Sequence, residues 1–145
     1  MWIKGLILSA LIVMGTVASG QTGAPVPIHP DSLKWTSPPN VQGLRSAWVV
    51  GGEKQAGAYI LRVKLAKGAR LNPHSHPDTR HTTVWSGTIR VGFGERFDES
   101  AMVSIPAGSV VVVPANTSHF VWSRDGDAEY QESGVGPTGT VFKPQ

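Results

Sequence analysis

The chain has 145 residues, a length that fits one domain with a sizeable apolar core and leaves no room for a second domain. Its formal net charge of +3, from 13 basic and 10 acidic residues scattered along the sequence, is too small to indicate a nucleic-acid-binding or membrane-surface protein. The absence of cysteine excludes disulfides, thiolate nucleophiles and thiolate metal sites.

The first twenty residues have the pattern of a secretory signal peptide. Lys4 gives a positive start, an apolar run extends over residues 6–17, and small residues precede Gln21. The apolar run is shorter than the about 20 residues that a membrane-spanning helix needs, and no basic cluster follows it. We therefore predict a cleaved leader at residues 1–20, a periplasmic or extracellular protein, and no stable membrane insertion after cleavage. An uncleaved N-terminal anchor is the alternative.

Residues 21–46 are rich in proline, glycine and polar groups and show little periodicity, so we interpret them as an extended arm. We expect one short strand at residues 33–35, where Trp35 would attach the arm to the main domain. The main domain then spans residues 47–145.

From residue 47 onward the sequence is typical of short strands separated by turns. Residues 62–65 alternate polar and apolar side chains, as a half-buried strand does. The predicted strands are residues 47–50, 59–65, 82–93, 101–105, 109–113, 120–122 and 128–135. Strands at a spacing of about 8–12 residues are typical of a sandwich or barrel, and the main domain has no convincing helical periodicity. We therefore predict an all-β fold.

Four of the five histidines lie in two short segments. His74 and His76 are two residues apart in an extended segment, so their imidazole rings would point to the same face. His81 opens the next predicted strand, where a reversal of the chain could bring it back toward that pair. His119 follows a turn after a valine-rich strand and would face the first segment across a barrel.

These two segments resemble the two motifs of the cupin superfamily. The first motif is a glycine, five residues, His-x-His, three or four residues, a glutamate, about six residues and a glycine. The second is a glycine, five residues, Pro-x-Gly, two residues and a histidine. The residues at or within one position of this spacing are Gly68, His74, His76, Gly87, Gly108, Pro114 and His119. The resemblance covers residues 47–135 and implies a single-domain jelly-roll β-barrel.

The sequence departs from the cupin motifs at two positions. His81 stands where the family usually has its ligand glutamate, and Asn116 replaces the glycine of the turn, where asparagine tolerates a left-handed backbone. The first segment also resembles that of small exported cupins with a histidine in this place. The resemblance thus implies one metal ion with four ligands: His74, His76, His81 and His119.

Four neutral imidazoles without a carboxylate or thiolate indicate a divalent transition metal ion, Zn, Fe, Cu or Ni, and argue against Mg or Ca. A histidine in place of an anionic glutamate makes the site one positive charge richer, which should favour anionic ligands. Such a site could act as a Lewis acid or in dioxygen chemistry, or its four ligands could close a purely structural site. The sequence identifies no other cofactor and no catalytic acid or base.

Side-chain alternation predicts which neighbours share the inward face of the ligands. Counting from His81 and from His119 gives three candidate pocket residues: Thr83, Trp85 and Val121. For Trp85, simple filling of the barrel interior is an equal alternative to a pocket wall. Asp78 and Arg80 could orient a histidine or contact a substrate, but we interpret them as part of a solvated loop.

Phe120 and Trp122 fall on the opposite face from His119. We expect them to form an apolar patch that packs against the N-terminal arm or against the second subunit of a homodimer.

The expected function is that of a metal-dependent cupin that acts on a small molecule, either as an oxygenase or as a Lewis-acid isomerase or hydrolase. The alternative is a non-catalytic cupin that binds or senses a metal or a small ligand. The sequence does not indicate the substrate.

Overall fold

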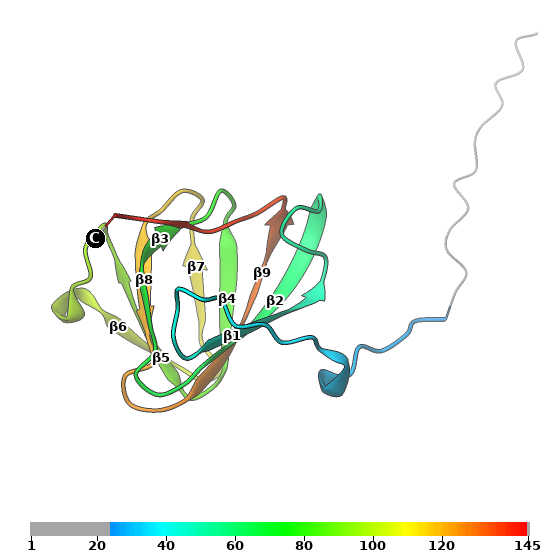
Figure 1. Cartoon of the computed structure of the whole chain (residues 1–145), viewed down its shortest axis with the longest axis horizontal. Helices are drawn as coiled ribbons and strands as arrows, with labels where there is room; N and C mark the ends of the chain where they lie inside the picture. The colour runs from blue at the N-terminus through cyan, green and yellow to red at the C-terminus, as the bar shows by residue number, and fades with distance from the viewer. Residues whose placement is uncertain (1–23, 145) are drawn as a thin grey trace, which may run out of the picture.

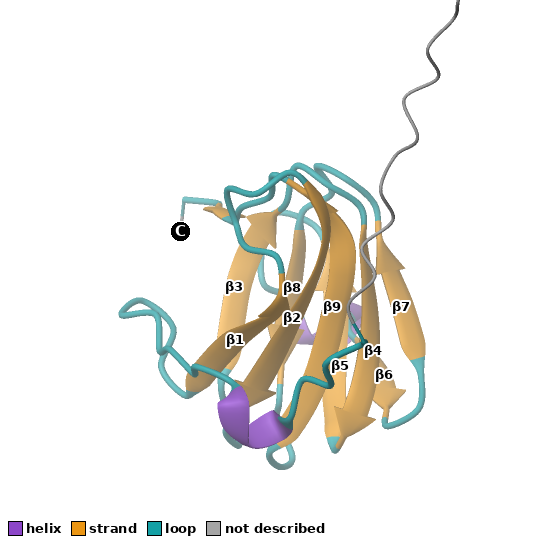
Figure 2. Ribbon diagram, turned by 90° about the vertical axis from the view of Figure 1, so that its right-hand side faces the viewer, coloured by secondary structure: helices purple, strands orange, loops and turns teal. Residues whose placement is uncertain are grey.

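The computed structural model of the chain describes residues 24–144, so the predicted leader lies outside the described residues. Two five-stranded antiparallel sheets face each other and form a jelly-roll barrel (Figure 1), and the view in Figure 2 shows the strands running side by side around it. The predicted all-β jelly-roll fold is confirmed. Within the described residues, no helix has the length and apolar character needed to cross a membrane.

Each sheet combines strands from distant parts of the chain. In the first sheet the order is β1 (Leu44–Val50), β2 (Gly57–Leu65), β9 (Ala128–Gly136), β4 (Arg80–Ser86) and β7 (Val110–Val113). In the second sheet the order is β10 (Val141–Phe142), β3 (Arg70–Ser75), β8 (His119–Trp122), β5 (Thr88–Phe93) and β6 (Val103–Pro106). Two short 3-10 helices lie outside the sheets: η1 (Pro30–Ser32) and η2 (Glu99–Ala101).

The strand predictions need two corrections. The predicted strand at residues 82–93 is divided into β4 and β5 by Gly87, which has a φ of 70°. A Cβ atom at this position would collide with the carbonyl oxygen of Asp127, so the turn requires glycine. The short strand expected at residues 33–35 is absent, and the arm instead makes one isolated bridge between Thr36 and Ser46.

Alternating residues of the strands fill the barrel interior. In β2 the residues Tyr59, Leu61, Val63 and Leu65 are buried and alternate with more exposed neighbours. Leu65 is paired with both Leu44 and Ala128, and these three apolar side chains close one end of the barrel. The red segment after β9 crosses the other end to reach β10 beside β3 (Figure 1).

Trp35 attaches the N-terminal arm to the outside of the first sheet, as the sequence predicted. The ammonium nitrogen of Lys64 lies 4.5 Å from the centre of the Trp35 ring, and the guanidinium carbon of Arg45 lies 5.9 Å from it. Both cations belong to strands of the first sheet, so cation–π contacts hold the arm against it.

Phe120 and Trp122 face outward, but their own chain covers them. The ring of Phe97 lies 5.0 Å from that of Phe120 and 6.0 Å from that of Trp122, and the guanidinium of Arg70 lies 4.1 Å above Trp122. Phe120 is 0% exposed. The expectation that the arm or a second subunit covers this patch is therefore wrong, because the connection between β5 and β6 folds back over the second sheet. The homodimer itself stays a prediction.

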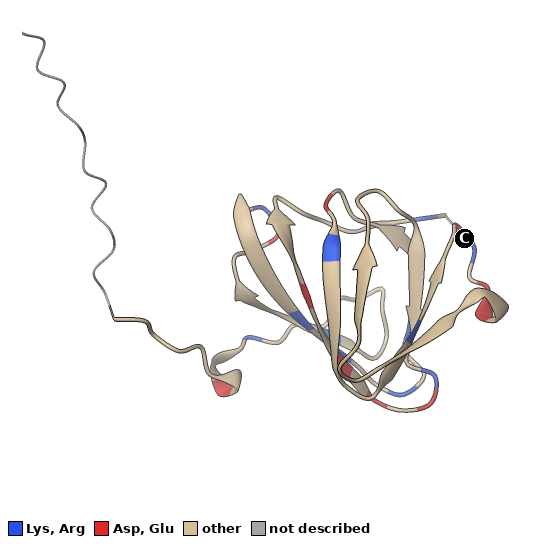
Figure 3. Ribbon diagram, turned by 180° about the vertical axis from the view of Figure 1, so that it is seen from behind, with Lys and Arg blue, Asp and Glu red and all other residues tan. Residues whose placement is uncertain are grey.

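Basic and acidic positions are interspersed along the strands and loops (Figure 3), which agrees with the small net charge of the chain.

Candidate metal centre

The rings of His74, His76 and His119 converge inside the barrel. The nearest ligand atoms of the three residues lie within 4.8 Å of one another, and all three side chains are buried. His74 and His119 are register partners on β3 and β8, with their ring centres 4.2 Å apart. His76 follows directly after β3, and its ring centre lies 5.0 Å from that of His74. The structure thus brings together three of the four histidines that the sequence indicated.

A backbone carbonyl orients each of these rings through Nδ1. The Nδ1–oxygen distances are 2.8 Å from His74 to Asn72, 2.7 Å from His76 to Gly139 and 3.1 Å from His119 to Thr117. Because a carbonyl oxygen only accepts a hydrogen bond, each Nδ1 carries the proton of the neutral ring, and each Nε2 keeps its lone pair. The Nε2 atom of His76 is buried and has no hydrogen-bond partner among residues 24–144. This tautomer leaves Nε2 of each ring free to bind a metal ion.

Burial keeps the three rings neutral. Desolvation is the main reason that the pKa of His74 is lowered to about 3, and the nearby His119 lowers it further. Desolvation, followed by the positive charge of Arg80, lowers the pKa of His76 to about 3. Desolvation also lowers the pKa of His119. Neutral imidazole is the form that binds metal ions. Near neutral pH the three rings can therefore act as ligands without first losing a proton.

His81 does not join this cluster. The inward-facing residues of β4 are Arg80, Thr82 and Val84. His81 is exposed on the outer face of the strand, Thr83 is half-buried there, and Trp85 is exposed. The prediction placed His81 on the inward face of β4, but that face begins one residue earlier, at Arg80. Three residues, not four, therefore separate His76 from the first inward-facing residue of β4. A shift of one residue moves every side chain of a strand to the other face.

The remaining candidate pocket residues have separate locations. Trp85 is 51% exposed outside the barrel, where the guanidinium carbon of Arg62 lies 3.3 Å from the centre of its ring. It therefore neither lines a pocket near the histidines nor fills the barrel. Val121 faces inward as predicted, and it is buried in the core next to His119.

Arg80, which the sequence placed in a solvated loop, lies inside the barrel with 5% of its side chain exposed. Three residues separate it from His76, which is the shorter of the two spacings that the first motif allows for its glutamate. Its Nη1 atom donates to Oε2 of Glu132 at 2.6 Å, and its Nε atom lies 3.9 Å from Oδ1 of Asp78. A buried cation paired with two carboxylates thus stands at a sequence position where the motif allows its ligand glutamate.

The charge expected from the sequence changes accordingly. The prediction of a site one positive charge richer than usual assumed a neutral His81 in place of a glutamate. The structure instead places one cation, Arg80, and two carboxylates, Asp78 and Glu132, beside the histidines. Without a metal ion the fixed charges next to the cluster sum to a negative value, so the expected preference for anionic ligands loses its basis.

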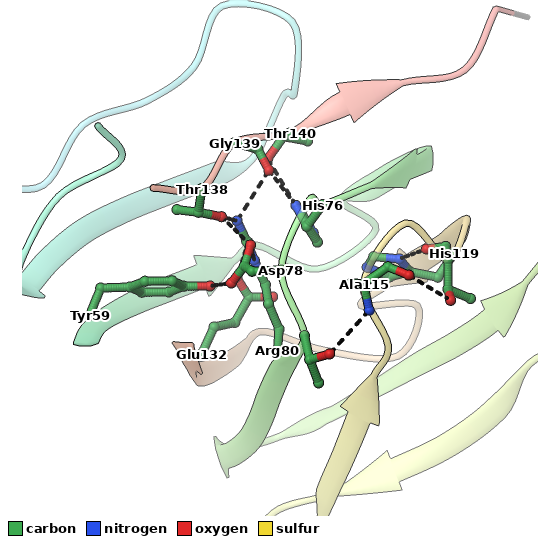
Figure 4. Close-up of polar contacts among 12 residues, drawn as sticks. Tyr59, His76, Asp78, Arg80, Ala115, His119, Glu132, Thr138, Gly139 and Thr140 are labelled. Carbon is green, nitrogen blue, oxygen red and sulfur yellow. Dashed lines mark hydrogen bonds and ion pairs between the residues drawn. The ribbon is translucent and has the colours of Figure 1, made fainter. Parts of the chain in front are cut away.

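A hydrogen-bonded network connects Arg80 to the C-terminal segment (Figure 4). Its Nη2 atom donates to the hydroxyl of Thr138 at 2.9 Å and to the carbonyl of Gly139 at 3.3 Å. Thr138 in turn donates to Asp78, which also accepts a hydrogen bond of 2.5 Å from the hydroxyl of Tyr59. The carbonyl oxygen of Gly139 therefore accepts hydrogen bonds from both His76 and Arg80.

A cavity of about 350 Å³ opens beside the histidines. Its apolar walls come mainly from Val41, Leu44, Leu61, Val63, Leu71 and Phe142. Its polar lining near the cluster consists of His74, His76, Arg80, Tyr130 and Glu132. Tyr130 and Glu132 were not among the residues predicted from the sequence, although alternation from the apolar Ala128 along β9 places both on the inward face.

Comparison with known sequences gives one family and one relative. A sequence model of the family described as Cupin matches residues 49–135. Germin-like protein 3-1 of Oryza sativa subsp. japonica is 32% identical over 75 residues, which are 51% of this chain. The match spans 33% of the length of that relative.

Several solved structures share the fold. Polyketide cyclase RemF from Streptomyces resistomycificus matches with a TM-score of 0.67 and 12% identity over 84% of this chain and 89% of its own. KdgF from Halomonas sp. matches with a TM-score of 0.61 and 19% identity over 74% and 92%. A structure of oxalate oxidase matches with a TM-score of 0.57 and 27% identity over 73% of this chain and 57% of its own. The first two similarities concern the fold alone.

Proposed function

Because the chain belongs to the cupin family, we propose that His74, His76 and His119 bind one divalent transition metal ion, which the protein uses in a reaction on a small molecule. The observation that carries this proposal is the convergence of three neutral imidazoles at the edge of a cavity. Each ring is oriented through Nδ1 and keeps Nε2 available as a donor to a metal ion.

The donor set fits a borderline transition metal. Imidazole nitrogen suits Zn, Fe, Cu and Ni, whereas Mg and Ca prefer oxygen ligands. A buried polar atom without a partner costs about 1–3 kcal/mol, and Nε2 of His76 is such an atom. A bound cation would satisfy this atom together with those of His74 and His119.

Three protein ligands leave coordination positions open. A four-histidine site of purely structural function is not supported, because His81 is exposed on the outer face of β4. An ion held by three histidines supplies a Lewis acid or, for redox-active metals, a centre for dioxygen chemistry. Isomerase, hydrolase and oxygenase reactions all remain within the proposal.

The chain's own residues have distinct roles in such a reaction. The carbonyls of Asn72, Thr117 and Gly139 orient the ligand rings. Apolar side chains in the cavity lining, such as Leu61, Val63 and Leu71, can pack against the reacting molecule. Arg80 holds Glu132 at the cavity wall, where the carboxylate can accept a hydrogen bond from a ligand.

The similar proteins support an enzyme over a non-catalytic binding protein. The structure of oxalate oxidase is 27% identical to this chain over the matched region. That activity belongs to that protein, and we take from it only the expectation of catalysis. The signal-peptide pattern at residues 1–20 supports export, which we propose as part of the function.

Metal analysis of the purified protein tests the proposal. We expect about one transition metal ion per chain by elemental analysis, and a saturable calorimetric titration of the chelator-treated protein with zinc. The variant His119→Ala should lose this ion, because it removes one of three ligands. A wild-type protein that holds no transition metal and cannot be reloaded would overturn the proposal.

A further inference from the structure

We propose that the cavity beside the histidines binds a small molecule with an alcohol or phenol group, and that Glu132 and Tyr130 hold this hydroxyl group. The inference rests on the proposed function, since it names the class of molecule that would meet the metal ion. It places a neutral hydroxyl group, and not an anion, next to Glu132.

Tyr130 and Glu132 lie two residues apart on the inward face of β9. In the register of the first sheet, Tyr130 is flanked by Val63 and Val84, and Glu132 by Leu61 and Thr82. Both residues line the cavity that also reaches His74 and His76. The two polar groups therefore stand side by side in the cavity wall, next to the candidate metal ligands.

Glu132 supplies a hydrogen-bond acceptor. Its Oε2 atom receives Arg80 at 2.6 Å, whereas Oε1 has no hydrogen-bond partner among residues 24–144. Arg80 cannot turn to a ligand anion instead, because its Nη2 atom already donates to Thr138 and Gly139, and its Nε atom faces Asp78 at 3.9 Å. A ligand carboxylate placed next to Glu132 would thus meet a fixed negative charge, and no side-chain cation is free there to offset it.

Tyr130 supplies a hydrogen-bond donor. The residue is buried, and its hydroxyl makes no hydrogen bond within the described part of the chain. Burial raises the pKa of this phenol well above its usual value, so the group keeps its proton and can donate. An alcohol or phenol group donates one hydrogen bond and accepts others, so it can satisfy Glu132 and Tyr130 together.

The rest of the cavity sets the remaining properties of the ligand. Leucine and valine side chains of β1, β2 and β3 form an apolar part of the wall together with Phe142 of β10, and Thr36, Asn40 and Ser46 are among the polar residues that also line the cavity. A volume of about 350 Å³ lies at the lower end of the range of small-molecule sites, which is about 300–1,000 Å³. The site therefore suits a molecule of one or two rings that has both an apolar part and polar groups.

Three probes that differ in one group test this assignment: 4-methylphenol, 4-methylanisole and 4-methylbenzoate. In calorimetric titrations of the metal-free protein at pH 7.5, we expect the phenol to bind about tenfold more tightly than either of the other two. The advantage of the phenol over the anisole should persist in the zinc-loaded protein, because it depends on residues of the chain; the benzoate is compared without zinc, since its carboxylate is itself a zinc ligand.

Variants of the lining residues test which side chains cause the preference for the phenol. Glu132→Gln should weaken binding of the phenol and strengthen binding of the benzoate, since part of the positive charge of Arg80 is then no longer offset. Tyr130→Phe, which keeps the packing, should reduce the advantage of the phenol over the anisole by several fold. Glu129→Gln is the matched control, because Glu129 lies on the outer face of the same strand and pairs with Arg62 and Lys64.

Tighter binding of the benzoate than of the phenol to the metal-free wild-type protein would overturn the inference, as would a preference for the phenol that requires zinc. Absence of saturable binding of all three probes to a protein that still binds zinc would overturn the inference and leave the metal site standing. Loss of zinc binding itself would instead refute the proposed function. Unchanged preferences in Tyr130→Phe and Glu132→Gln would show that these residues do not hold the ligand.

Discussion

His76 donates a hydrogen bond from Nδ1 to the backbone carbonyl of Gly139 at 2.7 Å, and this bond joins the candidate metal centre to the C-terminal segment of the chain. The segment is held at both ends, because Thr138 donates its backbone N–H to Glu53 and Lys143 donates its own to Pro73. The residues after β9 thus form part of the site, although they lie beyond both cupin motifs.

Truncation after Pro137 should lower the metal affinity by about 10- to 100-fold, because His76 then loses the carbonyl that orients its ring. Competition between the protein and a chromophoric zinc chelator measures this loss. Removal of Pro144 and Gln145 alone is the control, since it leaves Gly139 and β10 in place. Equal zinc affinity of the two truncated proteins would show that the Gly139 carbonyl has no role in metal binding.

The histidines should divide into two groups on substitution. His76→Ala should abolish stoichiometric zinc binding, whereas His81→Ala should retain it, because His81 is exposed on the outer face of β4. Elemental analysis after dialysis, with circular dichroism to confirm folding, distinguishes the variants. Loss of the metal ion in His81→Ala would restore the four-histidine site that the sequence suggested.

The two histidine motifs could be located from sequence because their geometry is local. Residues two apart in an extended strand share a face, so His74 and His76 had to be neighbours, and the turn before His119 is short. Asn116, where the motif has glycine, adopts a φ of 59°, the left-handed backbone that the sequence indicated. His81 was wrongly included because three and four intervening residues both fit the motif, and this one-residue difference reverses the face of β4.

The buried ion pair could not be inferred in the same way. Arg80 and Glu132 are 52 residues apart, and their contact depends on β4 and β9 being adjacent in the first sheet. Alternation along β9 alone would have placed Glu132 inside the barrel, but not beside a cation. The contact of Phe97 with Phe120 depends on the path of the loop that carries Phe97. A loop has no side-chain periodicity from which its path could be predicted.

Arg80→Met should destabilise the metal-free protein by about 3–5 kcal/mol, because the carboxylates of Glu132 and Asp78 are then left buried beside no cation. The double variant Arg80→Met, Glu132→Leu should lose less stability than the single variant. It removes the carboxylate of Glu132 together with Arg80, so only Asp78 is left without its cation. Urea unfolding followed by tryptophan fluorescence provides the free energies of unfolding. A loss of less than about 1 kcal/mol in Arg80→Met would contradict a buried ion pair.

The stability of the metal-free protein should fall as the pH is lowered from 7 to 5. The pKa values of His74 and His76 are lowered to about 3 in the folded protein, against about 6.5 in the unfolded chain, so the unfolded state binds more protons between these values. Each histidine then reduces the free energy of unfolding by up to about 1.4 kcal/mol per pH unit below pH 6.5. Unfolding midpoints in urea at pH 7, 6 and 5 measure this slope. The double variant His74→Gln, His76→Gln should show a much flatter profile, because carboxyl groups with ordinary pKa values of about 4 titrate mostly below this range. Equal slopes for the two proteins would mean that these rings are not held neutral by burial.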